Sequence, residues 1–138
     1  KGVQVVHSVG RSNALPTSTE NYLPLSYIDD MSSAYHAADL IIARSGALTC
    51  AELAAVGKFA ILIPLPIGNG EQSANAFDLQ AAGAAELVVD NKFNADWLIS
   101  NWDEIWNKAS SFKPVTKGEF SASEIIGKMI IDYVENNK

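Results

Sequence analysis

The sequence predicts an α/β fold in which a parallel sheet is covered by helices on both of its faces. Short apolar or β-branched runs alternate with runs of helical periodicity along most of the chain. Two of these runs, 40–44 and 59–66, are apolar throughout apart from Arg44, which is typical of strands buried on both faces. Strands and helices that alternate in this way form parallel sheets joined by crossover helices.

The first third of the chain predicts two strands and a helix. Residues 3–10 are β-branched and end in glycine, so they predict a strand, which a polar, turn-rich loop follows. Residues 22–27 predict a short strand whose proline indicates an edge or a strand end. Either Asp29 or Asp30 then caps a helix over 31–39.

The middle of the chain predicts two buried strands on either side of a helix. Residues 40–44 form the first of these strands. The helix over 48–56 stops at Gly57, which can adopt the left-handed conformation of a helix cap. Residues 59–66 form the second strand, which ends at two prolines and leads into a glycine-containing loop.

The next elements are a helix over 71–82, with Gly83 just beyond it, and a strand over 85–90. The helix is indicated by apolar side chains at helical spacing: Ala74, Phe77 and Ala81.

Asn94 is expected to cap a helix over 95–109, and Ser121 with Glu124 forms a capping-box pair for a terminal helix over 122–137. One face of the 95–109 helix gathers Trp102, Ile105, Trp106 and Ala109. We expect the tryptophans to pack against the sheet rather than to form a platform for carbohydrate.

Composition excludes several classes of function. The net charge of −6 argues against duplex nucleic acid or an anionic membrane as the main partner. No apolar run approaches the length of a membrane span. Cys50 falls on an apolar helical stretch and is expected to be a small buried residue. His7 and His36 have no second ligand at metal-binding spacing, so we expect no metal site and no catalytic triad.

The segment that follows the 40–44 strand is a candidate anion site. Ser45 and Gly46 form a turn into a helix, whose free N–H groups and dipole favour a phosphate, and Arg44 can add a charged contact. Thr49 can add a hydroxyl, and Glu52 can accept two hydrogen bonds from a vicinal diol. An alternative stays open: Thr49 and Glu52 match a capping box, and Arg44 can be paired with a nearby acid.

Two more polar groups lie at predicted strand ends, where ligands bind in folds of this type. Glu71, Gln72 and Asn75 crowd the first turn of one helix and suit the hydroxyls of a sugar, although taken alone they fit a solvated helix start better, with Glu71 favouring the helix dipole. The backbone around Ile28 can read a base edge, with Ile28 and Met31 as an apolar floor; a helix cap and core side chains are the alternative.

These motifs, taken in order between about residues 22 and 90, resemble the carboxyl-terminal domain of the MurG family, bacterial enzymes of glycosyltransferase family 28 with the GT-B fold. The matching elements are Asp-Asp-Met, Arg-Ser-Gly-Ala-Leu-Thr, the following glutamate, Pro-x-Pro and Gln-x-x-Asn-Ala. The resemblance implies a Rossmann-like donor domain without cofactor or metal. It implies that the backbone of Ile28 contacts uracil, that Glu52 holds the ribose and that Glu71, Gln72 and Asn75 lie near the sugar. The diphosphate loop would comprise Arg44, Ser45, Gly46, Ala47, Leu48 and Thr49.

The resemblance also implies a function for the longer protein, which transfers N-acetylglucosamine from UDP-GlcNAc to lipid I and so makes lipid II for peptidoglycan. We expect residues 1–112 to form an incomplete donor-binding domain and 113–138 a linker and helix, because the family's opening strand and its Gly-Gly-Ser-x-Gly-Ala loop are missing. The acceptor site, the catalytic base and the membrane contact would lie in the missing amino-terminal domain of a cytoplasmic enzyme on the inner face of the membrane. This chain alone would then be inactive and carry no catalytic residue.

Family members often have Gln at the position of Glu71, which puts its sugar contact in question. Two other functions stay open: a non-catalytic nucleotide-sugar-binding subunit that works with a separate acceptor-binding chain, and a purely structural α/β domain.

Overall fold

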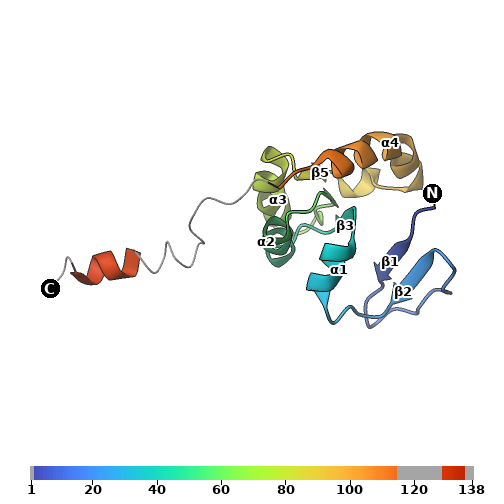
Figure 1. Cartoon of the computed structure of the whole chain (residues 1–138), viewed down its shortest axis with the longest axis horizontal. Coiled ribbons are helices and arrows are strands. Elements are labelled where there is room, and N and C mark those ends of the chain that lie inside the picture. Colours follow the sequence, from blue (N-terminus) through green and yellow to red (C-terminus); the bar gives the residue numbers. More distant parts are fainter. Residues whose placement is uncertain (1, 115–128, 136–138) are drawn as a thin grey trace.

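The computed structural model describes residues 2–114 and 129–135, and its strands form two parallel sheets (Figure 1). The strands are β1 (Val5–Ser8), β2 (Tyr22–Leu25), β3 (Ile41–Ala43), β4 (Ala60–Leu62) and β5 (Ala85–Leu87). One sheet pairs β1 with β2, and the other has the order β3-β4-β5. The parallel pairing is therefore confirmed, but the expectation of one continuous sheet is wrong for the described residues. In Figure 1 the β1–β2 pair lies to one side of the three-stranded sheet.

The helices follow the predicted order. They are α1 (Met31–Ala37), α2 (Ala47–Val56), α3 (Glu71–Ala81) and α4 (Ala95–Ser111), with a short 3₁₀ turn, η1 (Asp90–Lys92), before α4. Residues 129–135 are also helical. The predicted cap at Ser121 and Glu124 lies outside the described residues.

Local signals explain where the helices begin and end. The Asp30 side chain accepts a hydrogen bond from the Ser33 N–H at 2.9 Å, which decides between the two predicted caps of α1. Asn94 caps α4 in the same way. Gly57 ends α2 with φ 69°, as predicted, because this left-handed conformation costs glycine little.

The core lies on both faces of the three-stranded sheet. Successive strand residues point to opposite faces. Ala60 and Leu62 of β4 accordingly join a cluster with Leu53 of α2, whereas Ile61 joins a second cluster with Ile105 of α4. The expectation that helices cover both faces is thus confirmed.

The buried face of α3 is not formed by the apolar residues whose spacing indicated this helix. Phe77 is 65% exposed and Ala74 is exposed, whereas Ala76 and Leu79 are buried against the sheet. Apolar residues occupy several faces of this helix, so spacing alone did not fix which face is buried.

The tryptophans of α4 divide into two groups. Trp97 packs against the core cluster around Ile105, as expected. Trp102 and Trp106 instead stack on each other, with ring centroids 5.6 Å apart, and Trp106 is 38% exposed. The expected packing against the sheet therefore describes Trp97 better than the other two.

Candidate functional site

The start of α2 is the least capped helix N-terminus among the described residues. Gly46 is its N-cap and makes no side-chain cap hydrogen bond, and no acid lies in the first turn. By contrast, α1 and α4 are capped by side chains, and α3 carries Glu71 in its first turn. The first N–H groups of α2 lack intrahelical partners, so this end can receive an anion without competition from a carboxylate.

Helix α2 starts three residues earlier than a Thr49 cap would require, because its N-cap is Gly46. Thr49 lies within the first turn and Glu52 in the second, so these two residues do not form a capping box. That alternative is therefore wrong, and neither side chain is used to cap the helix. Thr49 is half-buried, while Leu48 is 73% exposed beside the helix start.

Arg44 follows β3, and its partners follow the other two strands of the same sheet. Its guanidinium donates to the Ile63 carbonyl oxygen at 3.2 Å and forms an ion pair with Asp90. The alternative that Arg44 pairs with a nearby acid is confirmed. Its side chain is 49% exposed, so the pair is screened by water and is worth at most about 1 kcal/mol.

Glu52 is held by a buried tyrosine from α1. The Tyr35 hydroxyl donates to Glu52 Oε2 at 3.2 Å, and Tyr35 is 7% exposed. Burial, together with the hydrogen bond and charge of Glu52, raises the pKa of Tyr35 to about 12. The phenol therefore stays protonated at neutral pH and remains a hydrogen-bond donor.

Two amides at the start of α3 attach this helix to neighbouring backbone. The Asn75 amide donates to the Ser45 carbonyl oxygen at 3.2 Å, and Gln72 Oε1 accepts from the Leu65 N–H at 3.0 Å. The first bond brings the loop before α2 together with the first turn of α3, so two of the predicted groups are neighbours in space.

Glu71 and Ile28 are not joined to these groups by hydrogen bonds within the described part of the chain. Glu71 turns back on its own loop, where Oε2 accepts from the Asn69 N–H at 2.9 Å. It lies so close to Gly68 that an added Cβ there would be 2.5 Å from Oε2. Ile28 is half-buried in the connection between β2 and α1.

Ser45 is completely buried, and its hydroxyl has no hydrogen-bond partner in the described structure. The phosphate contact predicted for this residue would therefore use its backbone N–H. A buried hydroxyl without a partner is destabilising.

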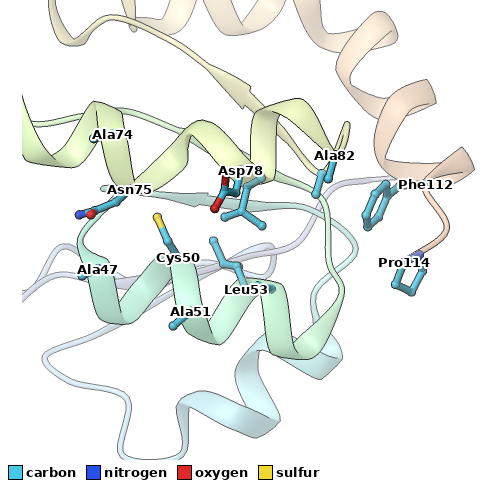
Figure 2. Close-up of a pocket in the computed structure, with 13 residues that line it drawn as sticks. Ala47, Cys50, Ala51, Leu53, Ala74, Asn75, Asp78, Ala82, Phe112 and Pro114 are labelled. Carbon is cyan, nitrogen blue, oxygen red and sulfur yellow. The ribbon is translucent and has the colours of Figure 1, made fainter. Parts of the chain in front are cut away.

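A groove of about 670 Å³ runs between α2 and α3 (Figure 2). Ala47 and Asn75 lie at one end, Phe112 and Pro114 at the other, and the Cys50 sulfur points in between the helices. Only Ala47 and Asn75 belong to the predicted site, so the groove adjoins that site without coinciding with it. Burial raises the pKa of the Cys50 thiol, which agrees with the predicted buried position.

The described residues contain no group of three or more His, Cys, Asp or Glu side chains arranged to hold a metal ion. None of the described helices combines the length and apolar character needed to cross a membrane.

Sequence reasoning missed two partners of the site, Tyr35 and Asp90. Asp90 lies at the end of a predicted strand on the same edge as Arg44, and this placement could have suggested the pair. Nothing in the sequence pattern indicates the bond between Tyr35 and Glu52, because it joins two different helices.

Several known proteins are similar to this chain. A transferase of Corynebacterium diphtheriae, UDP-N-acetylglucosamine–N-acetylmuramyl-(pentapeptide) pyrophosphoryl-undecaprenol N-acetylglucosamine transferase, is 44% identical over 98% of this chain and 39% of its own length. The transferase of the same name from Streptomyces coelicolor is 47% identical over 72% of this chain and 29% of its length. The crystal structure of Acinetobacter baumannii MurG matches with a TM-score of 0.55 and 35% identity, over 69% of this chain and 31% of that one. This chain therefore spans less than half the length of these relatives.

The likeness to MurG agrees with the predicted Rossmann-like α/β fold of a GT-B enzyme. The family model for the glycosyltransferase family 28 C-terminal domain matches residues 1–128. The match includes every residue of the candidate site, and we conclude that the chain belongs to the glycosyltransferase family 28 C-terminal domain family.

Proposed function

We propose that this chain binds the donor, UDP-GlcNAc, for a hexosyltransferase that transfers N-acetylglucosamine to lipid I. The observation that carries the proposal is the start of α2. It combines an uncapped, acid-free helix N-terminus with a carboxylate, Glu52, in the next turn of the same helix. A nucleoside diphosphate has a matching order of groups, because its ribose diol follows its phosphates.

The proposed contacts follow the positions of the residues. The backbone from Ser45 to Thr49 receives the diphosphate, and Arg44 lies beside it at the end of β3. Glu52 accepts the ribose hydroxyls, and the backbone of Ile28 reads the uracil. The first turn of α3, with Gln72 and Asn75, faces the sugar, while Glu71 contributes least because it is bound to its own loop.

Such a site would assist transfer through electrostatics. Negative charge grows on the departing diphosphate as the glycosidic bond breaks, and N–H groups and a guanidinium that are already in place stabilise that charge. The base that activates the acceptor hydroxyl, the lipid I site and the contact with the inner face of the cell membrane would be provided by other parts of a longer cytoplasmic enzyme. Within this chain we assign donor binding to residues 1–112.

The test is a titration of the folded chain with UDP-GlcNAc, UDP and ADP, followed by calorimetry and by NMR shifts. We expect the uridine ligands to bind more tightly than ADP, with shifts centred on residues 44–52. Glu52→Gln should weaken UDP binding about tenfold or more, because it removes the charged carboxylate that accepts hydrogen bonds from the two hydroxyls of the diol. The exposed loop variant Glu20→Gln is the matched control and should bind as the unaltered chain does. Equal affinity for all three ligands, or an unchanged Glu52→Gln variant, would contradict the proposal.

A further inference from the structure

The hydrogen bond between Tyr35 and Glu52 joins the core to the candidate site. The proposed function gives this bond no role. Tyr35 lies on α1 and belongs to the cluster that includes Leu53 and Leu62, so its ring is fixed by packing. Its hydroxyl reaches out of this cluster to Glu52 Oε2, 3.2 Å away. Glu52 itself is only half-buried on α2. A rigid group therefore holds a side chain that would otherwise rotate freely.

An unrestrained glutamate loses rotational freedom when it binds a ligand, and this loss weakens binding. Glu52 has no other hydrogen-bond partner in the described part of the chain. The bond from Tyr35 occupies one acceptor position of Oε2 and leaves Oε1 open. An ionised carboxylate has about four acceptor positions, so the two hydroxyls of a diol can still bind.

We propose that Tyr35 is a positioning residue for the nucleotide ribose: its hydroxyl fixes the plane of the Glu52 carboxylate so that both carboxylate oxygens meet the 2′ and 3′ hydroxyls. The inference rests on the proposed function, since it requires a nucleotide at the start of α2. Tyr35 does not itself contact the ligand; it acts through Glu52. The raised pKa of Tyr35 agrees with this role, because the phenol must keep its proton in order to donate.

This role makes a prediction that simple structural damage does not share. Tyr35→Phe keeps the buried ring and removes only the hydroxyl, so the fold should persist. Its effect should appear only with ligands that carry the diol. We expect Tyr35→Phe to weaken UDP binding about fivefold, through the lost preorganisation of Glu52. The affinity for 2′,3′-dideoxy-UDP should be the same in the unaltered chain and in Tyr35→Phe.

The experiment is calorimetric titration of the unaltered chain, Tyr35→Phe, Glu52→Gln and the double variant with UDP and 2′,3′-dideoxy-UDP. In the Glu52→Gln background, Tyr35→Phe should cause no further loss of UDP affinity, because the group that it positions no longer carries the charge. The inference alone is overturned if Tyr35→Phe binds UDP normally, or if it weakens both ligands equally. If the unaltered chain binds no UDP, the proposed function fails and the inference fails with it. The two failures are therefore distinguishable.

Discussion

Replacing Ser45 by alanine is expected to stabilise the folded chain. The Ser45 side chain is 0% exposed and its Oγ has no hydrogen-bond partner in the described structure, so folding removes this hydroxyl from water without compensation. An unsatisfied buried hydroxyl costs about 1–3 kcal/mol. The void left by one oxygen atom, about 15 Å³, costs only about 0.4 kcal/mol at ~24 cal/mol per Å³. The balance favours Ser45→Ala by about 0.6 to 2.6 kcal/mol.

The assay is urea denaturation followed by circular dichroism, with thermal unfolding as a second measure. For a chain of this size, 1 kcal/mol corresponds to a rise of about 3–5 °C in Tm. Ser111→Ala is the control, because Ser111 is exposed and its hydroxyl bonds only to carbonyls of its own helix. The affinity for UDP should change less than about twofold, because the Ser45 side chain is buried and only the backbone of this residue is expected to contact the phosphate. A less stable Ser45→Ala variant would refute the reasoning, because it would mean that the hydroxyl has a partner in solution.

Two further predictions concern a glycine and an ion pair. Gly57→Ala should lower the free energy of unfolding by about 2–3 kcal/mol, because alanine is strained at φ 69° and its Cβ would lie 2.6 Å from Pro114 Cβ. The control is Gly83→Ala, where φ is 68° and no atom lies within 4 Å of the added Cβ. In the same urea assay this control should lower the free energy of unfolding by only about 1 kcal/mol. Asp90→Asn should strengthen UDP binding by up to about fivefold and make the affinity more dependent on salt, because it frees the positive charge of Arg44 from an exposed ion pair. Calorimetry at two ionic strengths measures both effects. Weaker binding would contradict the prediction and show that Asp90 holds Arg44 in place for the ligand.

The parts of the fold that local chemistry determines could be predicted from the sequence. Caps at Asn94 and Gly57 depend on a few neighbouring residues, and the structure has both. The pairing of strands into one or two sheets depends on contacts between distant residues, which spacing does not report. We expected a single sheet, but β1 and β2 form a separate pair. Val5 and Leu23 in these two strands stay exposed.

The same distinction applies to the candidate site. The order of groups along the start of α2 is local, so sequence could identify Arg44 and Glu52 as polar residues with a possible shared ligand. The partners that hold them come from elsewhere: Asp90 follows β5, and Tyr35 lies on α1. Residue type indicates what a side chain can bind, whereas only the folded chain shows what it already binds.

The Arg44–Asp90 pair illustrates why a structural role and a binding role need not exclude each other. A guanidinium has five N–H donors, and the hydrogen bonds to Ile63 and Asp90 both come from the Nη1 nitrogen. The donors on its other nitrogens remain for an anion. Because the pair is half-exposed, it contributes little to stability, and a diphosphate that competes with Asp90 would displace it at small cost. The pair therefore leaves most of the hydrogen-bonding capacity of Arg44 to the ligand that we propose, and removing Asp90 adds the rest.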